Sequence, residues 1–449
     1  MTPEPRARQP HTHEAGSPEG GAREGRSREP RTPAELDPRA TNQPGRRGLL
    51  LAGTAGAGAL GVGAAAVGLE RALRGSGPTS GPADQAEAPL HGEATLPFHG
   101  EHQAGVGTRA QASSSYLALD LREEVDRAGI IRMLRLLTDD AARLTQGRPA
   151  LADTEPELAT APARLTVTFG FGRGLLERAQ VEVPAWLGPL PAFEIDELQE
   201  DFCGGDLLLQ VASDDPLTVS HAARMLLKDS RAFTTVRWVQ QGFRRAHGTE
   251  RPGATQRNLF GQVDGSANPQ LDSSHFDAVV WIDEGPFAGG TSMVIRRIRM
   301  DLDGWDEADP AAREQSTGTK LSNGAPLSGQ EEGEHADFEA RSEHGFPLIP
   351  EFAHMRRARG VDEGVHDEIF RRPYNYEDPP APGSGALSES GQIFTSFQAD
   401  LEGQFIPIQQ RLSDLDLLNM WTTPIGSAVF AIPPGCAEGE FVGQAVIGD

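Results

Sequence analysis

The chain has 449 residues, of which 37% are hydrophobic, with 52 glycines and 34 prolines, so it can form two domains with an apolar core and much irregular structure. A net charge of −24 argues against a protein that binds nucleic acid or anionic membranes through a basic face. Cys203 and Cys436 are the only cysteines, which excludes a disulfide framework and a cysteine metal site, although the two can pair in an exported protein.

Residues 1–90 are expected to lie outside the folded body. Residues 1–45 have almost no large apolar side chain, which predicts disorder. Arg46 and Arg47 then precede a mildly apolar run at 49–69, typical of a twin-arginine export signal and less so of a retained membrane anchor, and a flexible linker follows. The sequence thus predicts a protein exported in the folded state to the cell envelope or the medium.

Segment 91–255 is expected to form one half of the body. Apolar residues recur every three or four positions between residues 125 and 144, which predicts a helix with one buried face. Residues 164–172 alternate between apolar and polar, which predicts a strand. The other elements expected here are strands at 114–122, 206–213 and 235–243 and a helix at 216–230.

Segment 256–449 is expected to form the other half. The expected strands lie at 278–285, 290–300, 392–401 and 427–433, and the expected helices at 305–315 and 407–420, with a long polar loop at 316–348. Strands grouped around helices without a strict βαβα period favour the α+β class. The best interpretation is two ferredoxin-like halves, each a sheet with helices on one face.

Two stretches concentrate chemically active residues, and the first is NLFGQVDGSANP, residues 258–269. Gly261 and Gly265 permit backbone angles closed to other residues, so the turn can present the Asp264 side chain in a fixed direction. Taken alone, the Asp-Gly and Asn-Pro pairs of this stretch are also common in ordinary turns without a function.

The second stretch is residues 351–376. His354 is followed by five arginines, which predict an anionic partner, although acidic residues of the same segment can also neutralise them. His354 by itself is compatible with either a ligand or a structural histidine. The arginines are Arg356, Arg357, Arg359, Arg371 and Arg372, and the acidic residues are Asp362, Glu363, Asp367 and Glu368.

Taken together, nine motifs in series resemble the dye-decolourising peroxidase family of haem proteins, in particular its twin-arginine exported subgroup, over residues 93–446. The motifs are PFHGEHQAGV, LTVTFGFGRGLL, DFCGGDLLLQVASDD, NLFGQVDGSANP, IRRIRMDLDGWD, NGAPLSG, AHMRRA, RRPYNY and SFQADLEGQFIPIQQRL.

The resemblance implies a dimeric α+β barrel fold of two ferredoxin-like halves, with haem b held mainly by the second. His354 matches the axial iron ligand, Asp264 the acidic position of the Gly-x-x-Asp-Gly motif, and Arg371 the distal arginine. The implied reaction is the reduction of hydrogen peroxide and oxidation of an organic donor. The alternative is a deferrochelatase, which takes haem itself as substrate and releases its iron. A homo-oligomer is compatible with either.

The chain departs from the family pattern at two places. Gln262 and Val263 replace an aromatic and a basic residue that are common before the acidic position, and residues 360–370 lack the usual proline-containing run. The first departure affects the haem edge or substrate access, and the second leaves the contacts to the haem propionates there undefined.

The remaining site residues follow from what haem chemistry needs. The imidazole of His354 needs an acceptor for its second N–H, for which Asp400 is the candidate. Arg359 is the candidate partner of a propionate, and the backbone of Gly265, Ser266 and Ala267 is expected to pack against the haem.

A carboxylate base on the peroxide side, with aspartates ionising near pH 4, predicts turnover that is fastest in acid. Bulky donors cannot reach an enclosed haem, so electrons would pass through surface aromatic residues, unless these residues belong to the core. The candidates are Tyr374, Tyr376, Trp238, Trp281 and Trp421.

Overall fold

The computed structural model describes residues 90–359 and 368–448. The disordered N-terminus, export signal and linker expected at residues 1–90 fall, except for the last residue, outside the described residues, and so do the acidic residues at 362, 363 and 367. None of the helices in the described part of the chain has the length and apolar character that crossing a bilayer requires.

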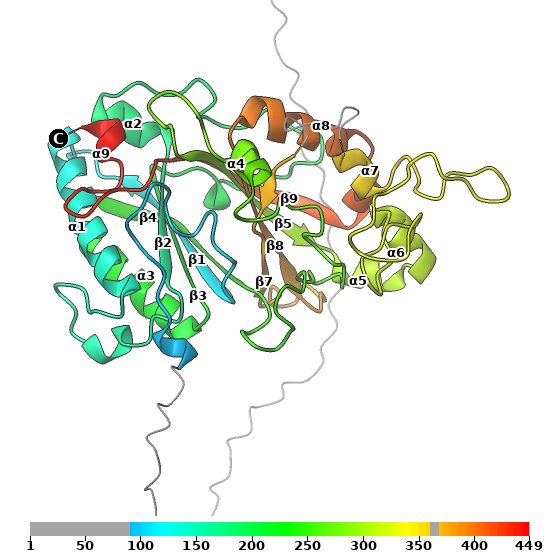
Figure 1. Ribbon diagram of the computed structural model, residues 1–449, viewed down its shortest axis with the longest axis horizontal. Coiled ribbons are helices and arrows are strands. Elements are labelled where there is room, and N and C mark those ends of the chain that lie inside the picture. Colours follow the sequence, from blue (N-terminus) through cyan, green and yellow to red (C-terminus); the bar gives the residue numbers. More distant parts are fainter. Residues whose placement is uncertain (1–89, 360–367, 449) are drawn as a thin grey trace, which may run out of the picture. The chain divides into compact units, whose positions relative to one another are not determined.

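The first half is an antiparallel sheet with helices packed on one face, as Figure 1 shows for α1 and α3. Its strands lie in the order β2, β3, β1, β4, which is that of a ferredoxin-like unit. The six expected elements of this half are confirmed. They are β1 (Ser113–Leu121), α1 (Arg127–Thr145), β2 (Thr166–Phe171), β3 (Leu207–Ser213), α3 (Pro216–Ser230) and β4 (Thr234–Phe243).

The second half repeats this order, because β9, β5, β8 and β7 lie side by side and antiparallel. The short strand β6 pairs with β8 as well. Its helix α8 (Ile406–Leu415) lies between β8 and β9 in the chain. The strands are β5 (Thr291–Met300), β6 (Phe370–Arg371), β7 (Tyr374–Asp378), β8 (Glu389–Gln398) and β9 (Thr422–Ile432).

The two sheets join into one closed ring. β2 pairs with β9 at Phe171 and Ala431, and β4 pairs with β7 at Phe243 and Asn375. The prediction of an α+β fold built from two ferredoxin-like halves is therefore confirmed. The boundary expected at residue 255 falls in the segment that connects β4 to the second half.

Successive side chains of β1 point to opposite faces of the sheet, so the ring divides the core into two parts. Leu117 and Leu119 pack with the buried face of α1 and α3 outside the ring, whereas Tyr116 and Ala118 pack with residues of both halves inside it. The buried face of α1 is the one that the sequence spacing predicts. Ile130, Leu134, Leu137 and Ala141 all have 0% exposure.

Three segments differ from the sequence prediction. Residues 278–285 are not a strand: Ser273 caps the N–H of Phe276, and the apolar run ends the helix α4 (Ser274–Val280). The helix expected at 305–315 is two helices, because Asp309 caps a new one that has Pro310 in its first turn. The helix expected at 407–420 ends at Leu415.

Several short elements have no counterpart in the prediction. They are α2 (Arg173–Ala179), α7 (His354–Ala358), α9 (Gln444–Ile447), the 3-10 turns η1 (His91–Glu93), η2 (Pro156–Ala159), η3 (Glu200–Phe202) and η6 (Leu417–Met420), and the π-helix η5 (Leu401–Phe405). The two helices that replace the one expected at 305–315 are α5 (Leu302–Glu307) and α6 (Pro310–Thr317).

The two cysteines do not form the disulfide that the sequence left open, because both are free thiols. Cys203 donates to the carbonyl of Gln199 at 3.2 Å. Cys436 is buried beside His99, and burial raises the pKa of its thiol to about 11.

Two carboxyl groups face each other between α1 and α3, and they predict a pH-dependent stability. Burial and the neighbouring Asp140 raise the pKa of Asp229 to about 7, against the opposing charges of Lys228 and Arg231. An aspartate in the unfolded chain ionises near pH 4. The folded state therefore keeps the proton longer, and the free energy of unfolding falls as pH rises from about 4 to about 7.

The variant Asp229→Asn replaces the titrating carboxyl group with an amide that does not ionise. Its melting temperature is expected to exceed the wild-type value by a margin that grows between about pH 4 and 7, reaching roughly 2 to 4 °C. Thermal unfolding across this range measures the margin, with Asp139→Asn, an exposed carboxylate on the same helix as Asp140, as the control. A margin that does not change with pH would contradict the prediction.

Candidate active site

Asp264 lies at the second glycine of the turn, where Gly265 has φ +133°, a conformation that other residues rarely adopt. Its side chain is 12% exposed, and its Oδ1 lies 3.1 Å from Nη1 of Arg371. Its Oδ2 accepts a hydrogen bond of 2.7 Å from the buried Gln392 amide on β8. Both oxygens are held, so the turn presents the carboxylate in one direction.

Arg371 owes its position to Asn268, a residue of the same turn. The backbone N–H of Arg371 donates to Oδ1 of Asn268 at 3.1 Å, and its carbonyl accepts from Nδ2 at 2.7 Å. The next residue, Arg372, points to the opposite face, as neighbours in extended backbone do, and bonds to the Thr108 carbonyl and to Gln111. Only Arg371 of the arginine pair therefore faces Asp264.

His354 is the first residue of α7, and its imidazole is oriented by a buried carboxylate. Its Nδ1 donates to Oδ2 of Asp416 at 2.6 Å, while Oδ1 of Asp416 accepts from the Leu418 N–H at 2.9 Å. The prediction that Asp400 accepts the second N–H of His354 was wrong, because Asp416 does so. The Asp400 carboxylate caps the π-helix η5 by accepting from the Gly403 N–H at 2.9 Å, and so it is used elsewhere.

The pKa of His354 responds to the charges of both other expected site residues, Asp264 and Arg371. Burial is the largest influence on the pKa of His354 and lowers it, but the charge and hydrogen bond of Asp416 raise it, and the net pKa lies above its ordinary value of 6.5. Arg371 and Asp264 also act on this pKa, the first lowering and the second raising it. The three side chains therefore lie within electrostatic range of one another.

His354 keeps part of its ring accessible, because 35% of its side chain is exposed. Among residues 90–359 and 368–448, no hydrogen bond engages its Nε2, since the one bond that its ring makes uses Nδ1. The ring is thus fixed at Nδ1 and has Nε2 available as a ligand atom.

The arginines beside His354 hold α7 in place. Arg356 donates to the Phe338 carbonyl at 2.8 Å, and Arg357 to the Arg411 carbonyl on α8 at 3.1 Å. Arg359 follows the last residue of α7, where its N–H donates to the carbonyl of Met355. Its expected role at a propionate remains a prediction.

A carboxylate that the sequence did not point to supports the Asp264 turn. Oε1 of Glu332, in the long polar loop, accepts hydrogen bonds from Ser266 at 2.8 Å and from Thr255 at 2.5 Å. Glu332 is half-buried, whereas Glu331 beside it is exposed. One side chain therefore ties together both sides of the segment that carries Asp264.

The candidate aromatic relays are mostly core residues. Four of the five have at most 8% exposure, so an organic electron donor cannot contact them at the surface. They are Tyr374, Tyr376, Trp238 and Trp281, whereas Trp421 is half-buried.

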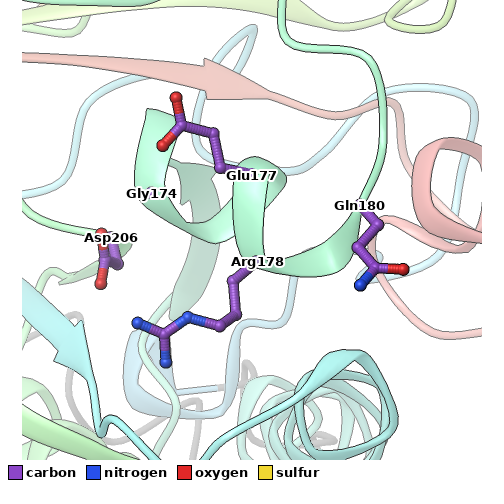
Figure 2. Close-up of a pocket in the computed structure, with 5 residues that line it drawn as sticks. All are labelled: Gly174, Glu177, Arg178, Gln180 and Asp206. Carbon is purple, nitrogen blue, oxygen red and sulfur yellow. The ribbon is translucent and has the colours of Figure 1, made fainter.

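A hollow of about 450 Å³ lies elsewhere, beside α2 (Figure 2). Its Arg178 already donates to the carbonyls of Arg122 and Val125, and its Asp206 accepts from the Leu121 N–H. It contains none of the site residues. The lining residues are Gly174, Glu177, Arg178, Gln180 and Asp206.

Two family models match the chain. Residues 103–244 match the model "Dyp-type peroxidase, N-terminal", and residues 255–437 match "Dyp-type peroxidase, C-terminal". The first match ends just after β4, and the second begins before the Asp264 turn. The two models therefore correspond to the two halves of the ring.

Characterised relatives and solved structures agree with these matches. A dye-decolorizing peroxidase of Thermobifida fusca is 38% identical over 77% of this chain and 83% of its own length. A deferrochelatase of Escherichia coli is 32% identical over 78% of this chain and 87% of its own length.

Among solved structures, a DyP-type peroxidase from Cellulomonas bogoriensis has a TM-score of 0.77 and 48% identity, covering 80% of this chain and 100% of that one. Ferric DtpA from Streptomyces lividans has a TM-score of 0.76 and 36% identity, covering 81% and 100%.

Proposed function

The chain belongs to the Dyp-type peroxidase family, and on that basis we propose that His354 binds the iron of haem b while Asp264 and Arg371 act on hydrogen peroxide. Membership makes the protein a haem-dependent peroxidase, which reduces hydrogen peroxide and oxidises an organic donor. The form of haem, the roles of single residues and the donor belong to the proposal.

The residues present fit an iron porphyrin. The Nε2 of His354 makes no hydrogen bond within the described residues, and its other nitrogen is fixed by Asp416, which is the usual support for a metal-binding imidazole. Arg371 and Asp264 act electrostatically on the same imidazole, which supports a ligand site with charged residues close by. When bound, the haem supplies the redox-active iron at which the oxygen–oxygen bond is cleaved.

His354 and Asp416 would set the donor strength of the imidazole. The Asp416 carboxylate accepts the Nδ1 proton, so Nε2 carries the lone pair and becomes a stronger donor. The second oxygen of Asp416 is fixed by the Leu418 N–H, which keeps the imidazole plane in one orientation.

Asp264 and Arg371 would handle the proton and charge of the peroxide. An Asp264 oxygen accepts the proton of one peroxide oxygen and returns it to the other, so that water can leave. Arg371 stabilises the negative charge that develops, because its guanidinium is not lost by deprotonation. Gln392 keeps the carboxylate from turning away.

The observation that carries this proposal is the Asp264–Arg371 contact within electrostatic range of a carboxylate-oriented His354. The test is the absorption spectrum of the purified protein before and after one equivalent of hydrogen peroxide. A haem band that changes with peroxide, and returns when an organic donor is added, is expected. A protein without a haem band after reconstitution would refute it.

Glu332 gives a further prediction for this reaction. Without its carboxylate, Ser266 and Thr255 lose their common acceptor, so the Asp264 segment is less well positioned. Glu332→Ala is expected to slow the reaction with peroxide by about tenfold to a hundredfold, as small misplacements of catalytic groups do. Stopped-flow absorbance measures this rate. Glu331→Ala removes an exposed neighbour with the same charge and should leave it unchanged.

Release of iron from haem is the second candidate function, because deferrochelatases of several bacteria are similar to this chain. Both functions would use the same haem site. Formation of protoporphyrin from haem in stoichiometric amount, without peroxide, would favour iron release. Porphyrin fluorescence distinguishes the two, because a peroxidase leaves the iron in place.

We also infer export by the twin-arginine route, from residues that lie outside the described part of the chain. Arg46→Lys together with Arg47→Lys is expected to keep the protein in the cytoplasm, whereas Arg26→Lys with Arg28→Lys is not. Cell fractionation with a peroxidase assay measures the distribution. Equal export of both variants would contradict the inference.

A further inference from the structure

Three potential metal ligands from separate segments meet in the first half of the ring. His91 lies in η1, Asp214 directly follows β3, and His247 lies after β4. Their ligand atoms all lie within 4.8 Å of one another. The cluster shares no residue with the haem site. We propose that it binds one divalent transition-metal ion, and that zinc suits it best.

The donor set and its spacing support this assignment. Two imidazole nitrogens and one carboxylate oxygen are ligands that zinc prefers. Oδ2 of Asp214 lies 2.9 Å from Nε2 of His91 and 3.8 Å from Nδ1 of His247. Ligands of a tetrahedral zinc lie roughly 3.3 Å apart, given bonds of about 2.0 to 2.1 Å. The two distances from Asp214 would therefore need to change by about half an ångström each.

The imidazole rings must turn before both can bind. They are stacked with centroids 3.6 Å apart and planes 3° apart, so their in-plane lone pairs run side by side. The His247 side chain is 52% exposed, which leaves it free to rotate toward the ion. Three protein ligands leave a fourth position for water.

The carboxylate is already held in a ligand's orientation. The Asp214 side chain is 4% exposed, and its Oδ1 accepts from the Ala112 N–H at 3.0 Å. Arg164 donates to Oδ2 at 3.0 Å and is itself fixed by the Arg109 carbonyl. Such outer hydrogen bonds are usual for metal-binding carboxylates. The positive charge of Arg164 opposes a cation, so the affinity is expected to be about micromolar, far weaker than in structural zinc sites.

Binding would have a structural consequence. The ion would connect the first turn of the described chain to the segments that follow β3 and β4, three places far apart in sequence. Because only the folded state holds the three ligands together, it should bind zinc more tightly than the unfolded chain does, and zinc should raise the melting temperature.

The test is titration of the haem-loaded full chain with zinc chloride by calorimetry, with His354 occupied by haem. Wild type is expected to bind one ion at this site, and His91→Ala, His247→Ala and Asp214→Asn should each weaken that binding by at least about tenfold. His275→Ala, which disrupts the exposed His275–Glu368 pair, is the matched control and should bind like wild type.

The location is tested separately by anomalous diffraction from zinc-soaked crystals, where a peak among residues 91, 214 and 247 is expected. Affinities that are equal in wild type, His91→Ala and His247→Ala would overturn the proposal. So would a zinc peak elsewhere with none at this cluster.

Discussion

Replacing His354 by alanine is expected to reduce haem occupancy by more than about tenfold and to abolish peroxidase turnover, because the iron loses its protein ligand. The ratio of haem to protein absorbance after gel filtration measures occupancy. The fold should persist, since α7 is also held to its surroundings through Arg356 and Arg357. Asp416 loses its partner in a buried position, which costs about 1 to 3 kcal/mol.

A rescue experiment separates ligation from a structural role. His354→Gly with added imidazole should regain haem binding and activity, because free imidazole can occupy the vacated space. Asp416→Asn is expected to weaken haem binding by about tenfold to a hundredfold, as loss of an orienting partner does. Asp414→Asn, an exposed carboxylate two residues away, is its control. Normal haem retention in His354→Ala would contradict the assignment.

Asp264→Asn and Arg371→Ala are each expected to slow the reaction with hydrogen peroxide by about a hundredfold to ten-thousandfold while haem remains bound. The amide that replaces the carboxylate in the first variant cannot accept the peroxide proton, and the second variant lacks the charge that stabilises the departing oxygen. Stopped-flow absorbance under excess peroxide gives the rate, and the haem band gives the occupancy.

Two controls make this prediction specific. Asp272→Asn makes the same change at an exposed residue whose positive φ asparagine also tolerates, and it should react like wild type. Wild type is expected to turn over fastest in acid, and Asp264→Asn to lose that acid activity. An Asp264→Asn enzyme with the wild-type rate and pH profile would show that the proton moves through another group.

The first half of the fold was predictable because its local signals agree. Asp126 caps α1 and Asp215 caps α3, with Pro216 in the first turn, so each helix begins where a cap, a proline or the apolar spacing places it. The strands of this half alternate or are continuously apolar between turns.

The second half was predicted less well, because there helices end or begin at polar residues that lie within apolar stretches of sequence. Asp416 interrupts what reads as one helix, since its carboxylate starts the next turn at Leu418 and also reaches His354, 62 positions away in sequence. A pairing at that separation has no local signature, which explains why Asp400, in a more noticeable motif, was chosen instead. The apolar run at 278–285 reads equally as a strand or a buried helix segment.

The site was predictable to the extent that its residues lie in motifs. The motifs indicated Asp264, His354 and Arg371, and the structure shows Asp264 and Arg371 in contact and both within electrostatic range of His354. Gln392, Asn268 and Glu332 were missed, because each acts through a long-range hydrogen bond to a motif residue or to the segment beside it. The strand pattern predicts that Gln392 lies in a sheet, but it does not predict that its side chain bonds to Asp264.

We propose that His354 and the Asp264–Arg371 pair lie on opposite sides of one haem. A crystal structure of the haem-loaded protein is the decisive experiment. Iron bonded to Nε2 of His354 is expected, with Asp264 and Arg371 across the porphyrin from it. Iron bound by another side chain, or Asp264 on the same side as His354, would contradict it.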